Sequence, residues 1–193
     1  MGGSSLIRWG GTAAVLGAVL TIFGDLLPTD TSWTYALLYA VGCASLVVGI
    51  TGVYLYLRRS GRLGLLGTVG FYLCFFAFAV VAILSVGILL NLWGAQWYET
   101  LAAIEIPLIL GTAMFGVAIL RAGRLPRGGA WLLVAYSVSV VGVIVAMAVS
   151  GYTLGDWLWT LPAVPFTFGW VWLGYGLWSE SGASAAGRPS RVS

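Results

Sequence analysis

Long apolar runs dominate the chain, and short polar stretches separate them. Each run is about as long as the roughly 20 residues that an α-helix needs to cross a bilayer. Transmembrane β-strands would instead show about ten residues of alternating character. The pattern therefore predicts an all-α, polytopic membrane protein with a bundle of six transmembrane helices, over residues 6–27, 34–57, 63–92, 100–120, 129–150 and 157–178.

The stretches between these runs are too short to hold a soluble module. We therefore predict a single six-helix transmembrane domain over residues 1–178. A flexible cytoplasmic tail is predicted over residues 179–193, where the apolar character ends.

Glycines and prolines recur at matching spacings in different helices. The fourth and sixth helices share one pattern and the first and fifth share another: Pro107, Gly111, Gly116 with Pro165, Gly169, Gly174, and Gly10, Gly11, Gly24 with Gly128, Gly129, Gly142. Internal symmetry of this kind is common in transporters. It suggests three parallel helical-hairpin repeats, with the middle hairpin the most diverged. Chance matches among 28 glycines are the alternative.

Composition supports a membrane protein and argues against most enzyme classes. Hydrophobic residues make up 60% of the chain and charged residues 8%, whereas a soluble domain is about 25% charged. The chain has no His and no Lys, so it can build neither a Ser–His dyad nor a Schiff base. Its two cysteines do not form a CxxC pair. We predict no enzyme activity, no cofactor, no metal and no nucleic-acid partner.

The arginines predict the orientation of the chain in the membrane. With six crossings, all nine fall on one side: Arg8, Arg58, Arg59, Arg62, Arg121, Arg124, Arg127, Arg188 and Arg191. Because positively charged loops stay in the cytoplasm, we predict an inner-membrane protein with both termini cytoplasmic. The lipid bilayer is the main partner. The two loop clusters, Arg58, Arg59, Arg62 and Arg121, Arg124, Arg127, could also hold anionic lipid headgroups, or they could set the topology alone.

Acidic residues gather on the opposite side. Asp25, Glu99 and Asp156 are predicted as outer-face acids, while Glu105 lies inside the fourth helix. Two interpretations of Glu105 stay open: its side chain reaches outer water, or it faces the bundle, where intramembrane acids usually bind ions or protons.

Four residues form the candidate ligand or ion site. Besides Glu105 they are Pro107, Pro165 and Asn91. Each proline removes a backbone donor from its helix and leaves a carbonyl without its usual partner. Asn91, together with Ser85, could supply polar groups from the third helix.

Two function classes remain. One is a small permease, channel or binder for a cationic or lipophilic small molecule, which the acids and prolines favour. The other is a non-enzymatic accessory, sensor or lipid-organising membrane subunit, favoured by the scarcity of polar side chains near mid-membrane. A homo-oligomer or a larger membrane complex fits both.

Overall fold

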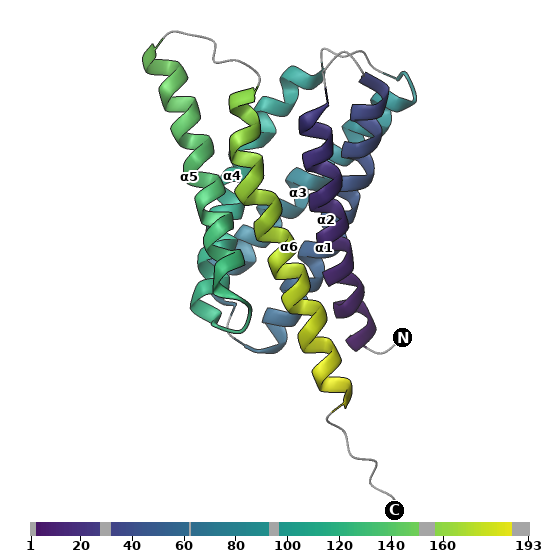
Figure 1. The fold of residues 1–193 in the computed structure, drawn as a ribbon, viewed down its shortest axis with the longest axis vertical. Coiled ribbons are helices and arrows are strands. Elements are labelled where there is room, and N and C mark those ends of the chain that lie inside the picture. The colour runs from purple at the N-terminus through teal and green to yellow at the C-terminus, as the bar shows by residue number, and fades with distance from the viewer. Residues whose placement is uncertain (1–2, 28–31, 62, 93–96, 151–156, 187–193) are drawn as a thin grey trace, which may run out of the picture.

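The chain forms six α-helices. The computed structural model describes residues 3–27, 32–61, 63–92, 97–150 and 157–186, and these ranges contain no β-strand. The helices are α1 (Gly3–Leu26), α2 (Ser32–Arg59), α3 (Gly64–Leu89), α4 (Trp97–Ala122), α5 (Arg127–Ser150) and α6 (Trp157–Ala186) (Figure 1). The all-α fold and the six-helix bundle predicted from the apolar runs are confirmed.

The helix ends differ from the predicted ones most clearly in α3 and α6. Helix α3 ends at Leu89, before Asn91 adopts a left-handed backbone with φ of 53°. Helix α6 continues to Ala186 and so includes the first part of the predicted tail. An apolar run marks where a helix meets lipid, but Ser, Glu and Ala can extend the same helix beyond it.

Five helices of the described chain, α1 to α5, are long and apolar enough to cross a membrane. Helix α6 is 30 residues long, but its many Trp, Gly and Pro residues lower its mean hydropathy. It nevertheless runs beside α1 and α5 for much of its length (Figure 1). These apolar helices fit an integral membrane protein.

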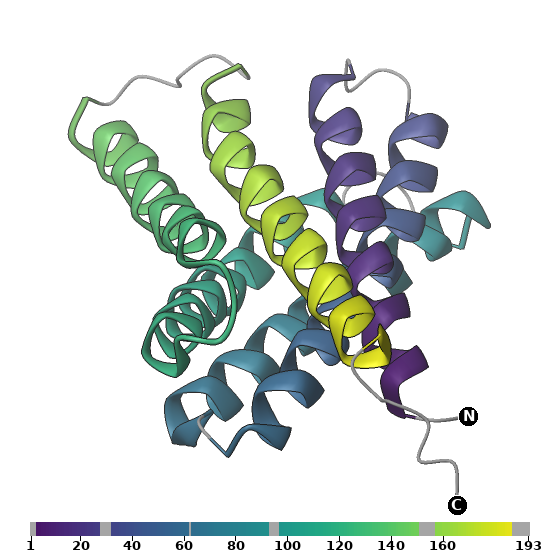
Figure 2. The same ribbon diagram turned by 60° about the horizontal axis from the view of Figure 1, so that its bottom comes forward.

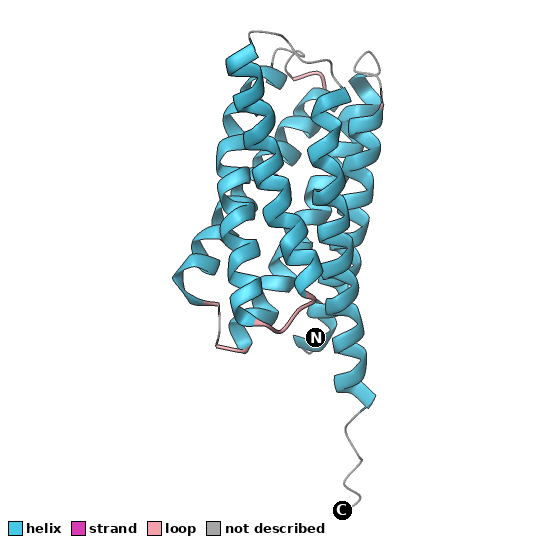
Figure 3. Ribbon diagram, turned by 60° about the vertical axis from the view of Figure 1, so that its left-hand side comes forward, coloured by secondary structure: helices cyan, strands magenta, loops and turns pink. Residues whose placement is uncertain are grey.

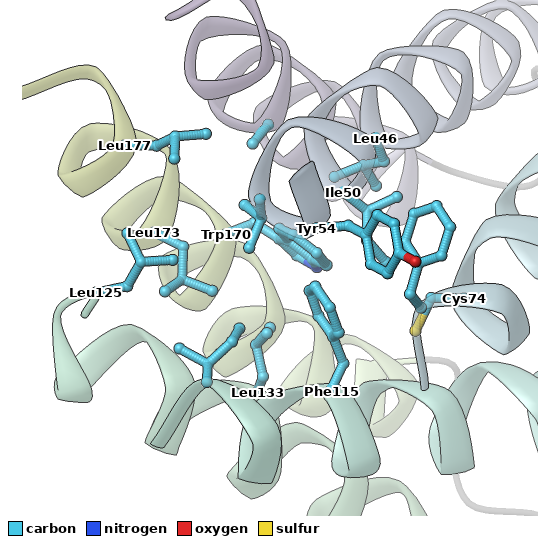
Figure 4. Packing of buried hydrophobic residues seen from close by; sticks show 14 of the residues in the cluster. Leu46, Ile50, Tyr54, Cys74, Phe115, Leu125, Leu133, Trp170, Leu173 and Leu177 are labelled. Atoms are coloured by element: carbon cyan, nitrogen blue, oxygen red, sulfur yellow. The ribbon is translucent and has the colours of Figure 1, made fainter. Parts of the chain in front are cut away.

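The helices form a closed ring. Each helix packs against the next one in the chain, and α6 returns to pack against α1. Figure 2 shows α6 between α5 and α1. The centre of the ring is filled by large apolar side chains from several helices, including Leu46, Phe115 and Trp170, all fully buried (Figure 4). Helices α1 and α4 therefore lie on opposite sides of the ring.

Glycines allow neighbouring helices to approach closely. A Cβ atom on Gly10 of α1 would lie 2.7 Å from the Cα of Gly52 in α2. One on Gly11 would lie 2.6 Å from the carbonyl oxygen of Gly174, where α6 closes the ring. Since these contacts are to backbone, no side-chain rotation could relieve them. Small residues are typical of such helix interfaces in membranes.

The second and third hairpins pack in the same register. In α3–α4, a Cβ on Gly111 would meet Leu73 and Cys74; in α5–α6, one on Gly169 would meet Leu132 and Leu133. Similarly, Gly70 faces the carbonyl of Gly111, and Gly129 faces the carbonyl of Gly169. The shared register supports the repeat for these two hairpins. The expectation that the middle hairpin is the most diverged stays a prediction.

The two ends of the bundle differ in charge. The described loops after α2 and α4 lie at the same end as the start of α1 and the end of α6 (Figure 3). Five exposed arginines gather there, in α2 and around the α4–α5 loop: Arg58, Arg59, Arg121, Arg124 and Arg127. We call this the arginine end. The opposite end, where α1 finishes at Leu26 and α4 begins, we call the acidic end after Asp25 and Glu105.

Candidate ion-binding site

Asp25 lies in the last turn of α1 and is held by α2. The phenol of Tyr39 donates a hydrogen bond to the half-buried carboxylate of Asp25. The ring of Tyr39 stacks on that of Tyr35, with centroids 4.4 Å apart. It also lies against Gly24, where a Cβ would come within 2.7 Å of the ring. Gly24 thus leaves room for the phenol to reach the neighbouring Asp25.

Glu105 lies on the buried face of α4. Ile109 and Thr112, four and seven residues later, are buried, and these spacings place side chains on one helix face. Ile106 and Leu110, by contrast, are exposed. The half-buried carboxylate of Glu105 is therefore on the side of α4 that faces the bundle. This placement favours the second of the two interpretations of Glu105.

Glu105 and Asp25 come close enough to interact electrostatically across the ring. Both also act on the phenol of Tyr136 in α5. The level of Tyr136 is fixed by its neighbour Ser137, whose hydroxyl donates to the carbonyl of Ile109 in α4 at 3.0 Å. Tyr136 thus lies about one helical turn below Glu105, toward the arginine end. Carboxylates and phenols from α1, α2, α4 and α5 converge in the acidic half of the bundle.

Aromatic side chains fill the interior below this site. The ring centroids of Tyr136 and Phe166 are 4.8 Å apart, and Phe166 lies 6.3 Å from Trp170. Phe78 and Phe115 contact Trp170 from α3 and α4. Trp170 is fully buried, and its indole N–H has no hydrogen-bond partner among the described residues (Figure 4). The cluster separates the acids from the arginine end.

The other predicted site residues are more dispersed. Pro107 and Pro165 are half-buried, and α4 and α6 remain helical through both. Asn91 is exposed in the turn after α3, and no described contact joins it to Glu105. Ser85 is buried in α3. The predicted outer-face acids Glu99 and Asp156 lie outside the residues whose side chains the structure describes, as does Arg62 of the predicted headgroup clusters.

Two members of the site, Tyr39 and Tyr136, were not among the predicted residues. Tyr39 follows Asp25 by 14 residues, on the next helix. A tyrosine on an apolar helix is usually a packing residue with a polar tip. Nothing in the sequence therefore distinguished Tyr39 or Tyr136 from other packing tyrosines.

Comparison with family models, curated proteins and solved structures produced no match to this chain.

Proposed function

We propose that this protein is a small permease, channel or binder that takes up a cationic small molecule at the acidic end of the bundle. The observation that supports it is the placement of two half-buried carboxylates in the acidic half of the bundle: Asp25 on α1, bound by Tyr39, and Glu105 on the buried face of α4. Acids in the interior of a membrane bundle usually mark an ion or substrate site. In the described part of the chain, the arginines all lie near the other end. A bound cation would supply the missing positive charge.

The aromatic surroundings favour an organic, lipophilic cation over a bare metal ion. Tyr39 and Tyr136 border the carboxylates, and Phe166 extends the aromatic surface inward from Tyr136. Aromatic rings attract cations through their quadrupole, by about 0.5–2 kcal/mol for each suitable contact. An ammonium or phosphonium group with apolar substituents could use both the charge and the rings. A hydrated ion such as Na⁺ could use only the charge.

The packed interior constrains how such a cation would move. Trp170 lies against both Phe166 and Phe115 below the site, so a cation bound near Glu105 would meet packed rings on its way to the arginine end. A permease would have to move these rings to release it at the other end. A binder would leave them in place.

We further propose that the arginine end faces the cytoplasm and that the membrane is the inner one. The support is the gathering of exposed arginines at the end where α1 begins and α6 ends (Figure 3), because positive charge favours the cytoplasmic side.

Calorimetric titration of the purified protein in detergent tests the binding site. We expect tetraphenylphosphonium to bind, and Na⁺ at the same concentration to compete poorly. Glu105→Gln and Asp25→Asn should each weaken tetraphenylphosphonium binding about tenfold, the effect of losing ~1.4 kcal/mol. Glu180→Gln is the matched control, because Glu180 is an exposed acid at the arginine end that accepts a hydrogen bond from Tyr56. An equal loss in all three variants would contradict the proposal.

Flux measurements in liposomes distinguish a permease or channel from a binder. A permease or channel should carry tetraphenylphosphonium across the bilayer, with Glu105→Gln slowing the flux. A binder should show the same affinity without flux. If the protein showed neither binding nor flux, the proposed function would be refuted.

One observation favours the second candidate, an accessory subunit. Toward the acidic end, α5 is exposed on most of its surface: Val141, Ile144, Val145 and Val149 are exposed, and a Cβ on Gly142 would meet nothing within 4 Å. A helix so weakly covered could pack against another membrane protein. Tight co-purification that is lost on Gly142→Leu, with tetraphenylphosphonium binding absent, would support this function instead.

A further inference from the structure

An open pocket lies at the arginine end, between the end of α2 and the start of α3. It has a volume of about 450 Å³ and is lined in part by Tyr54, Arg58, Thr68 and Tyr72. Leu63 and two glycines, Gly61 and Gly64, complete its wall. Both glycines have positive φ, and neither would have a neighbour within 4 Å of an added Cβ. Glycine is favoured by this backbone, and the missing side chains leave the pocket open.

Arg58 supplies the charge of the pocket. Its guanidinium carbon lies 6.0 Å from the centre of the Tyr54 ring, within reach of a cation–π interaction. Tyr54 is in turn buried and stacks on Phe71, with centroids 4.0 Å apart. The arginine side chain is exposed, yet it rests on a ring that the core holds in place. Because arginine binds phosphate oxygens through paired donors, a held guanidinium beside an open pocket suits a phosphate group.

Hydroxyl groups complete the polar wall. Thr68 and Tyr72 are one turn apart on α3 and so share a helix face. The Thr68 hydroxyl donates to the carbonyl of Gly64 at 3.1 Å, so its oxygen can accept a hydrogen bond from a headgroup hydroxyl but has no hydrogen left for a phosphate oxygen. Tyr72 is half exposed and marks the transition from the polar pocket to the apolar surface of α3.

An exposed apolar stripe continues from the pocket along α3. Leu65, Val69, Phe76 and Val80 are exposed and follow the helical spacing of Tyr72. In a bilayer this stripe faces acyl chains. A ligand that joins an anionic head to apolar tails could therefore occupy the pocket and the stripe together, whereas free phosphate could use only the pocket.

We propose that this pocket binds the phosphate headgroup of an anionic membrane lipid, with Arg58 as the main cationic contact and the acyl chains along α3. Among the arginines predicted as headgroup ligands, Arg58 is the one that lines the pocket in the described residues. Arg121, Arg124 and Arg127 belong to the other loop. The proposal is independent of the cation site at the acidic end.

Native mass spectrometry of the detergent-purified protein, titrated with phosphatidylglycerol or phosphatidylcholine, tests the site. We expect one phosphatidylglycerol to bind more tightly than phosphatidylcholine. Arg58→Gln should lower that affinity about fivefold, as expected for one cationic residue near an anionic headgroup. Thr68→Val should lower it by less. Arg124→Gln is the matched control, since Arg124 is an exposed arginine at the same end that does not line the pocket.

Three outcomes would overturn the proposal. Equal losses in Arg58→Gln and Arg124→Gln would mean a diffuse attraction to positive charge. Equal affinity for the two lipids would mean that the headgroup charge is not recognised. Competition by millimolar inorganic phosphate at the same ionic strength would identify a soluble phosphate site without a lipid component. Because Arg58 is exposed, an unchanged thermal midpoint of Arg58→Gln confirms that the variant is folded.

Discussion

Replacing Gly111 by alanine tests whether close contact between helices, and not lipid exposure alone, holds the bundle together. The new Cβ would lie 2.8 Å from the backbone nitrogen of Cys74 and 2.8 Å from the Cβ of Leu73. Carbon atoms normally rest about 3.5–4.0 Å apart, so α3 and α4 must separate by several tenths of an ångström. A backbone nitrogen cannot rotate away. Overpacking of this kind typically costs about 1–3 kcal/mol.

Gly142→Ala is the matched control. Gly142 is also inside a helix, but it is exposed and an added Cβ would meet nothing within 4 Å. Both substitutions gain the same helix propensity, about 1 kcal/mol, so the difference between them measures overpacking alone. Gly169→Ala, at the equivalent contact of the third hairpin, should resemble Gly111→Ala.

Thermal unfolding in detergent, followed by tryptophan fluorescence, measures the difference. Each kcal/mol corresponds to roughly 2–4 °C for a chain of this size, so Gly111→Ala should melt several degrees below Gly142→Ala. Equal midpoints for the two variants would refute the packing argument, because they would show that α3 and α4 separate without cost.

Two further predictions concern topology and hydrogen bonding. Reporter fusions after Gly61 and Gly182 should give a cytoplasmic signal and one after Asp30 an external signal; an external signal at Gly61 would reverse the proposed orientation. Ser137→Ala should lower the free energy of unfolding by about 0.6 kcal/mol, the average for hydrogen bonds between membrane helices, because its hydroxyl bonds to Ile109 of α4. Ser139→Ala should have no measurable effect in the same denaturation assay, since the Ser139 hydroxyl bonds within its own helix to Ala135.

The number and type of the helices could be predicted because membrane crossing requires long apolar segments. The end of α6 could not be predicted in this way, because residues that favour a helix follow the apolar segment and extend the helix beyond the lipid. The close contacts were only partly predictable: the glycine spacing suggested repeated hairpins, but it did not show which helices the glycines join. Gly11 illustrates this limit, because it contacts Gly174 of α6, at the far end of the chain.

The sequence predicted the position of Glu105 inside a helix, but it did not predict the residues that lie in the same part of the bundle. Glu105 stood out as an acid inside an apolar run, and the structure places it on the buried face of α4. Its expected partners were in the third helix. The structure instead places it in the same half of the bundle as Asp25 of α1 and Tyr136 of α5. Asp25 resembled a surface acid because it is close to a helix end. The partner of Asp25 is Tyr39 on the next helix, a pairing that local sequence does not encode.

The closure of α6 onto α1 has a consequence for how the protein is made. Helices enter the membrane in chain order, so the face of α1 around Gly11 has no partner until α6 has been synthesised. Thr167 of α6, whose hydroxyl lies 3.5 Å from the carbonyl of Ala18, belongs to the same late interface. A ribosome-bound chain that ends before residue 157 would thus expose the face of α1 around Gly11 to lipid and to other proteins. Helix α6 therefore completes the ring, and quality control of the nascent chain would have to recognise or shield the face of α1 that α6 later covers.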